Sequence, residues 1–224
     1  MSLYSWLINN YIEIFGAVTG VIYVFLEIRQ TIWLWPVGII TSAVYIWVFL
    51  TSKIYADMSL QVYYLLISCL GWYWWMKGTG QRAQGEGLKD KKESGRRGEV
   101  LKEELQVTRL KLKTGLILAV VFVLLYFILY MVLTRLTDSP VPMRDSFITS
   151  LSIVGTWMLA RKIYEHWYLW IVVNFVSAVL FLNRGLYPTV ILYVVYGVMS
   201  FAGLRAWKRT INHLPTHFPG GERE

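Results

Sequence analysis

Two tryptophans and an asparagine form the clearest binding pattern in the sequence. Trp167 and Trp170 are three residues apart, and Asn174 follows four residues later within an apolar stretch. On a helix of 3.6 residues per turn, this spacing places two indoles and one amide on the same face. An asparagine in such surroundings needs hydrogen-bond partners, either on neighbouring helices or on a ligand. Because two tryptophans precede it, the pattern favours a ligand over packing alone.

Other polar and aromatic side chains lie in the middle of apolar stretches. Gln61 and Tyr64 are three residues apart and could present a second polar edge, although an interhelical hydrogen bond would explain Gln61 equally. The aromatic residues deep inside their stretches are Trp47, Trp157, Tyr64, Tyr193 and Tyr196, which could line a cavity or pack helices. The predicted substrate-binding set is Trp167, Trp170, Asn174, Gln61, Tyr64, Trp157, Tyr193 and Tyr196.

The aromatic residues of the chain have two possible places, the membrane interface and the lining of a cavity. Aromatic residues make up 16% of the chain, which is enough for both an interfacial belt and a cavity lining. A cation over a Trp face gains roughly 0.5 to 2 kcal/mol without a buried carboxylate. Tryptophans near the predicted helix ends are assigned to the belt instead: Trp6, Trp33, Trp72, Trp74, Trp75 and Trp207.

Residues suited to catalysis or metal binding are few. His166 lies at a predicted helix boundary, the other two histidines lie in the polar tail, and no HExxH motif or Cys/His cluster occurs. The sequence therefore predicts no enzyme, no metal site and no cofactor.

Acidic residues also avoid the middle of the apolar stretches. The predicted helix ends hold Glu13, Glu27, Asp57 and Asp145, and we expect Glu27 to pair with Arg29 and Glu165 with Lys162. Without an acidic group at mid-span, facilitated diffusion is favoured over ion coupling.

Length and hydropathy define the elements that must position these residues. The chain is 56% apolar. Residues 116–133 form an uncharged stretch that is almost long enough, as a helix, to cross a hydrocarbon core of roughly 30 Å. Seven apolar windows occur, at residues 11–28, 33–50, 58–76, 115–133, 145–161, 167–183 and 187–207. We predict an all-α integral membrane protein with seven transmembrane helices in the lipid bilayer.

The distribution of Lys and Arg predicts the orientation. Half of the 22 basic residues lie in the polar segment 77–113, beside an apolar window, so the net charge of +8 indicates topology rather than nucleic-acid binding. In alternate loops, one side holds only Lys53, Arg135, Arg144 and Arg184. The positive-inside rule therefore predicts an external N-terminus and a cytoplasmic C-terminus. Residues 99–113 could additionally form an amphipathic helix on the membrane surface.

The chain also contains an internal repeat. Trp35 and Ser42 of the first copy match Trp170 and Ser177 of the second copy at one constant offset. After a three-residue deletion in the second copy, Tyr64 and four further residues of the first copy also have matches. The aligned later pairs are Tyr55 with Tyr187, Leu60 with Leu192, Tyr64 with Tyr196, Gly71 with Gly203 and Trp75 with Trp207. This alignment places Ile39 opposite Asn174 and predicts an asymmetric site. The predicted organisation is a three-helix repeat (1–76), a cytoplasmic polar linker (77–114), a connecting helix (115–133), a second repeat (145–207) and a cytoplasmic tail (208–224).

These residues resemble a known family, the PnuC vitamin transporters, whose architecture is similar to that of SWEET sugar transporters. The resemblance is carried by residues 53–75 (KIYADMSLQVYYLLISCLGWYWW) and 145–207, and its sharpest motif is Trp167-x-x-Trp170 followed by Asn174. It implies 3+1+3 parallel repeats and a site near the membrane midplane. It covers both repeats but not the linker or the tail.

The resemblance further implies uptake of nicotinamide riboside by facilitated diffusion through a bacterial inner membrane. Thiamine and riboflavin are the alternative substrates, and a cytosolic kinase would trap the product. A homotrimer is the assembly that SWEET-like relatives suggest. From another class, a membrane receptor or assembly protein whose aromatics only pack is the competing hypothesis.

Overall fold

Seven α-helices account for nearly all of the residues that the structure describes. The computed structural model describes residues 11–51, 55–77, 105–137 and 141–212, and within these ranges no strand is present. The helices are α2 (Tyr11–Ile28), α3 (Leu34–Thr51), α4 (Tyr55–Lys77), α6 (Leu112–Leu136), α7 (Pro142–Ala160), α8 (His166–Asn183) and α9 (Tyr187–Asn212). The seven predicted windows are confirmed to within a few residues. The linker residues 78–104, the tail from 213 and Trp6 lie outside the described residues.

The helices differ in how well each suits a lipid environment. By length and hydropathy alone, α3, α6, α8 and α9 can cross a membrane, and α2 carries a shorter apolar stretch, Ile14–Ile28. In contrast, α7 buries Ser146, Ser150, Ser152 and Thr156 inside the bundle. Polar side chains that face other helices rather than lipid lower the mean hydropathy of a helix without exposing polar groups to hydrocarbon.

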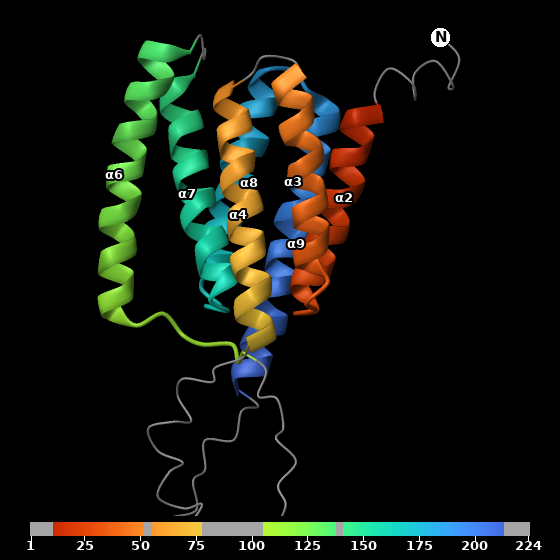
Figure 1. Cartoon of the computed structure of the whole chain (residues 1–224), viewed down its shortest axis with the longest axis vertical. Helices are drawn as coiled ribbons and strands as arrows, with labels where there is room; N and C mark the ends of the chain where they lie inside the picture. The colour runs from red at the N-terminus through yellow and green to blue at the C-terminus, as the bar shows by residue number, and fades with distance from the viewer. Residues whose placement is uncertain (1–10, 52–54, 78–104, 138–140, 213–224) are drawn as a thin grey trace, which may run out of the picture.

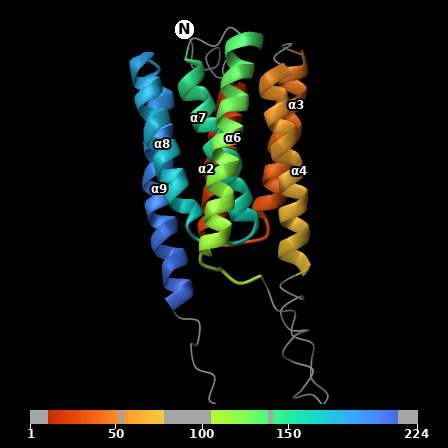
Figure 2. The same ribbon diagram turned by 90° about the vertical axis from the view of Figure 1, so that its left-hand side faces the viewer.

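Two similar triplets of helices, α2–α4 and α7–α9, form the bundle. Figure 1 shows that α2 and α7 run in the same direction, as do α4 and α9, while α6 runs the opposite way at the edge of the bundle beside α7. In Figure 2 the pair α3 and α4 lies on one side and the pair α8 and α9 on the other, with α2 and α7 between them. Each first helix also contacts the third helix of the other triplet, α2 with α9 and α7 with α4. The connecting helix α6 packs on α7 and buries no residue, so it is peripheral.

Matching tryptophan contacts fix the register of the two triplets. The Trp35 ring packs on Gly71 and meets Trp75 edge-on at 5.4 Å between centroids. In the same way, Trp167 packs on Gly203 and meets Trp207 edge-on at 5.9 Å. Trp35 therefore corresponds to Trp167, not to Trp170, and the three-residue deletion in the sequence alignment was wrong.

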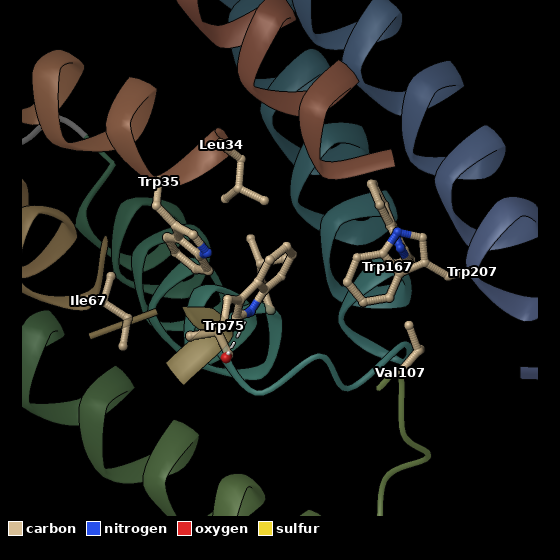
Figure 3. Close-up of a cluster of buried hydrophobic side chains, with 9 residues drawn as sticks. Leu34, Trp35, Ile67, Trp75, Val107, Trp167 and Trp207 are labelled. Atoms are coloured by element: carbon tan, nitrogen blue, oxygen red, sulfur yellow. Dashed lines mark hydrogen bonds between the residues drawn. The ribbon is translucent and has the colours of Figure 1, made fainter. Parts of the chain in front are cut away.

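The buried hydrophobic core lies at one end of the bundle, and its largest members are indoles (Figure 3). Trp75 and Trp207 are 6% and 0% exposed, so their assignment to the interfacial belt was wrong, whereas Trp33 is exposed as expected. Trp75 Nε1 donates to the Ala160 carbonyl at 3.2 Å, and Trp207 Nε1 donates to the Glu27 carbonyl at 3.0 Å. Each of these bonds joins the third helix of one triplet to the first helix of the other.

An extended segment before α6 covers this core. Residues 105–111 are not helical, which corrects the predicted surface helix over this part. The Thr108 N–H donates to Lys162 O at 2.9 Å, and Tyr164 N–H donates to Thr108 O at 3.1 Å. The Val107 side chain is buried in the tryptophan core. The segment thus fastens the start of α6 to the turn between α7 and α8.

Candidate binding site

A central cavity of about 480 Å³ lies between the two triplets. Its lining comes from α2, α3, α4, α7, α8 and α9, and α6 contributes nothing to it. This volume falls within the range of sites for small organic ligands. Both triplets supply one wall each, which is the arrangement the predicted repeat requires.

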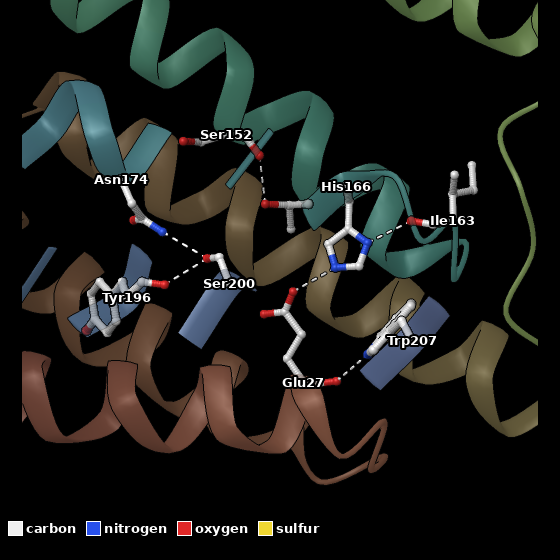
Figure 4. Close-up of polar contacts among 9 residues, drawn as sticks. Glu27, Ser152, Ile163, His166, Asn174, Tyr196, Ser200 and Trp207 are labelled. Carbon is white, nitrogen blue, oxygen red and sulfur yellow. Dashed lines mark hydrogen bonds and ion pairs between the residues drawn. The ribbon is translucent and has the colours of Figure 1, made fainter. Parts of the chain in front are cut away.

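The three motif residues of α8 reach this cavity together. Trp167, Trp170 and Asn174 all line it. Asn174 Nδ2 donates to Ser200 Oγ at 3.1 Å, and Ser200 Oγ donates in turn to the Tyr196 carbonyl at 2.8 Å (Figure 4). This chain of bonds holds the amide plane at the cavity wall, so Asn174 both links α8 to α9 and faces the space for a ligand.

The indole N–H groups of this site have no acceptor. Trp167 Nε1 and Trp170 Nε1 are buried and donate to no group in the described part of the protein. Buried N–H donors in proteins are almost always paired, and each orphan needs an explanation such as a ligand or an ordered water. Both residues line the cavity, but their Nε1 atoms are covered, so a solute in the cavity would meet the indole rings rather than the N–H groups.

Four more predicted residues line the cavity, and one does not. Gln61, Tyr64, Tyr193 and Tyr196 all face it. Trp157 lies outside the cavity and packs between two hydrophobic clusters. Its prediction as a cavity-lining residue was therefore wrong. The other deep tryptophan, Trp47, is 68% exposed on the outer surface of α3.

The corrected register also changes the expected asymmetry of the site. Ser42, not Ile39, corresponds to Asn174, and Ser68 corresponds to Ser200. Ser42 and Ser68 are buried and line the cavity, so the two walls carry polar groups at the same positions. The aromatic residues are the asymmetric part, since Gly38 stands where the second triplet has Trp170.

Sequence reasoning missed a buried acidic residue in the lining. Glu27 is 2% exposed, and its Oε1 lies 2.9 Å from Nε2 of His166, which is itself 0% exposed. The expected pair of Glu27 with Arg29 was wrong, because the Arg29 guanidinium lies over the Phe25 ring at 5.1 Å. The two partners are 139 residues apart in sequence, so no local pattern could have joined them.

Metal binding finds no support in the described ranges. No group of three or more His, Cys, Asp or Glu side chains comes together there. In the cavity lining, Glu27 alone has a carboxylate and no Lys, Arg or His side chain accompanies it.

A helical bundle with an apolar outer surface and a polar, aromatic cavity between two parallel triplets is an arrangement typical of membrane transporters. The chain belongs to the nicotinamide mononucleotide transporter family, whose model matches residues 10–209. The resemblance to PnuC transporters is thereby confirmed.

Relatives in this family differ in their named substrates. The nicotinamide riboside transporter PnuC of Escherichia coli is 26% identical over 211 residues, covering 88% of this chain and 85% of the relative. The riboflavin/roseoflavin transporter RibM of Streptomyces davaonensis is also 26% identical, over 87% of this chain and 83% of the relative. A crystal structure of the vitamin B3 transporter PnuC has the same fold, with a TM-score of 0.69, 22% identity, and coverage of 95% of this chain and 87% of that one.

Proposed function

We propose that this chain carries nicotinamide riboside, an NAD precursor, across the membrane by facilitated diffusion. The observation that carries the proposal is the cavity wall on which the rings of Trp167 and Trp170 lie beside the Asn174 amide. A nicotinamide riboside molecule has a cationic aromatic ring for the indole faces and hydroxyl groups for the amide. It is therefore matched by both chemical features of the wall.

Riboflavin is the second candidate, because a riboflavin transporter is as similar in sequence to this chain as a nicotinamide riboside transporter is. Its ring system is larger and neutral, whereas thiamine, the third candidate, is again a cation. Any of the three could stack on indoles, and the charge of the bound ring separates only riboflavin from the other two.

Equilibrium binding to the purified protein tests the proposal. Nicotinamide riboside, thiamine and riboflavin would each be titrated while tryptophan fluorescence is recorded, because Trp167 and Trp170 line the site. We expect saturable quenching with nicotinamide riboside at the lowest concentration. Tighter binding of riboflavin would transfer the assignment to the second candidate, and no binding of any vitamin would support a non-transporting membrane protein.

The proposal includes a cellular setting. We infer that the protein lies in a bacterial inner membrane. We place the N-terminus outside and the tryptophan core at the cytoplasmic end, because the basic residues at that end are exposed: Arg161, Arg205, Lys208 and Arg209. A cytosolic kinase that phosphorylates the nucleoside would keep uptake running downhill. We also expect assembly as a homotrimer.

A further inference from the structure

The Glu27–His166 pair joins the two triplets beside the cavity. Glu27 lies in the last turn of α2, and His166 is the first residue of α8. Figure 4 shows the imidazole held on both sides, with Nδ1 at 2.7 Å from the Ile163 carbonyl and Nε2 at 2.9 Å from Glu27 Oε1. The same ring meets the rings of Trp167 and Trp207 at 4.8 Å and 4.7 Å between centroids. These contacts fix the position of the carboxylate.

The second carboxylate oxygen of Glu27 has different surroundings. Oε2 accepts no hydrogen bond from the described residues, yet it is not one of the fully covered unpaired atoms, unlike the indole nitrogens of Trp167 and Trp170. Glu27 keeps 3% of its side-chain surface accessible and lines the cavity from α2, on the wall of the first triplet. A solute that lies against the indoles of the other wall can therefore reach Oε2.

The hydrogen bonds of His166 leave Oε2 without a proton. A carbonyl oxygen only accepts, so the Nδ1 atom facing Ile163 carries a proton. The contact between Nε2 and Oε1 needs one further proton, on either atom, because two lone pairs would otherwise face each other. In both arrangements the pair is neutral as a whole, and Oε2 can only accept a hydrogen bond. The matching group on a solute is a hydroxyl or an N–H.

The register of the two triplets places leucines at the equivalent of this pair. The turns after α2 and α7 have the same backbone hydrogen bonds, so Glu27 corresponds to Leu159 and His166 to Leu34. Both leucines are 0% exposed and belong to the tryptophan core. Two apolar side chains thus occupy this junction in the other copy, and replacing a buried polar pair by such a contact often costs no stability. Closing the junction therefore does not require Glu27 and His166.

Other polar groups of the lining offer weaker acceptors. Thr19, Thr156 and Ser200 donate their hydroxyl protons to backbone carbonyls of their own helices, at 2.8 Å each. Among the described lining residues, only Glu27 has a carboxylate, and it is ionised whenever the shared proton lies on Nε2. Hydrogen bonds to an ionised acceptor are roughly twice as strong as those between neutral groups. Glu27 is therefore the strongest acceptor in the lining.

We propose that Oε2 of Glu27, held in place by the bond to His166, accepts a hydrogen bond from a sugar hydroxyl of the solute. This inference rests on the proposed function and names the group that recognises the ribose of nicotinamide riboside. The Glu27–His166 bond stays intact, and no proton is exchanged when the solute binds or leaves. Recognition by Glu27 is therefore compatible with facilitated diffusion. It does not depend on the charge of the ring, since the pair is neutral as a whole.

Three probes separate the hydroxyl groups of the solute from its charge. Nicotinamide riboside has a cationic ring and ribose hydroxyls, and its reduced dihydro form keeps the hydroxyls on a neutral ring. In the N-methylnicotinamide cation, a methyl group replaces the ribose. Each compound would be titrated into the purified full-length protein by calorimetry. We expect N-methylnicotinamide to bind about tenfold or more weakly than nicotinamide riboside, because it lacks the hydroxyl donors.

A double substitution copies the leucines of the other junction. Glu27→Leu with His166→Leu should lower the affinity for both ribosides by about tenfold or more and leave that for N-methylnicotinamide unchanged. In Glu27→Gln, the amide N–H can donate to Nε2 while the carbonyl oxygen faces the cavity, so most of the riboside affinity should remain. Glu165→Gln is the matched control, since this carboxylate lies outside the cavity lining and accepts from the Leu110 N–H at 2.9 Å. It should change none of the three affinities.

The outcomes separate this inference from the proposed function. Equal affinity of the unmodified protein for nicotinamide riboside and N-methylnicotinamide would overturn the hydroxyl contact, as would undiminished riboside binding by the double variant. A loss for the two cations but not for the dihydro form would assign Glu27 to charge and overturn it too. If the unmodified protein binds none of the three compounds, the proposed function itself fails. Should the double variant not fold, Glu27→Ala, which keeps His166, takes its place with the same expectation.

Discussion

At the scale of single residues, the site depends on two indole rings and one amide at the cavity wall. Trp35, Trp167 and Trp170 each bury an indole N–H that has no acceptor in the described residues, but only the latter two residues line the cavity. Because their Nε1 atoms are covered, a solute would contact the rings and the Asn174 amide rather than the indole N–H groups.

Replacing Trp170 with phenylalanine should test the contribution of the indole ring. A smaller aromatic face remains, so we expect nicotinamide riboside affinity to fall severalfold from the weaker cation–π contact. Trp35→Phe removes an equally orphaned donor outside the cavity and should leave affinity unchanged. Equal losses in the two variants, measured by fluorescence titration, would argue against a ligand role for Trp170.

Replacing Asn174 with leucine should separate ligand binding from helix packing. The substitution removes the donor to Ser200 and the polar edge at the cavity, so affinity should fall by about tenfold or more. Asn183→Leu, an exposed position on the same helix, is the matched control and should bind normally. Size-exclusion chromatography would show that both variants fold, and an Asn174→Leu protein that binds like the original would refute the assigned role.

How far sequence predicts the site differs from residue to residue. Trp167, Trp170 and Asn174 were predictable because helical spacing alone brings them to one face. In contrast, Glu27 and His166 come from helix ends in different triplets, and each resembles an ordinary boundary residue in its own segment. The partner of a buried charge is a tertiary property, which local spacing does not encode.

At the scale of elements, hydropathy predicted where the helices lie, and packing determined their register. The repeat could be aligned with Trp35 opposite either Trp167 or Trp170, and nearby Ser, Ala and Val identities favoured the second choice. The structure instead places Trp35 opposite Trp167, because each of these rings packs on a glycine of the neighbouring helix, Gly71 or Gly203. Shape complementarity between helices is not visible in a list of matching letters.

Methyl groups added at these two glycines should have different effects on binding. Both Gly71→Ala and Gly203→Ala place a Cβ atom in contact with a tryptophan ring, so each should lower stability by about 1–3 kcal/mol through overpacking. Only Gly203→Ala displaces a ring that lines the cavity, Trp167, and only it should also weaken nicotinamide riboside binding severalfold. Thermal unfolding in detergent would measure the loss of stability, and titration with nicotinamide riboside would measure the loss of binding. Equal weakening of binding by both substitutions would contradict the assigned binding site.

At the scale of the whole molecule, two parallel triplets and a connecting helix require an odd number of crossings. The exposed basic residues at the tryptophan-core end then predict a cytoplasmic C-terminus. A reporter that fluoresces only in the cytosol, fused after residue 224, should therefore be bright in cells. A periplasmic enzyme reporter at the same place is the control, and activity from that reporter alone would reverse the orientation.

The central claim is that the cavity carries nicotinamide riboside, and uptake of the labelled compound into proteoliposomes measures this most directly. With equal pH on both sides, we predict saturable uptake that stops when the internal and external concentrations are equal and that is lost in Asn174→Leu. Uptake no faster than in protein-free liposomes, while the purified protein remains folded, would contradict the account.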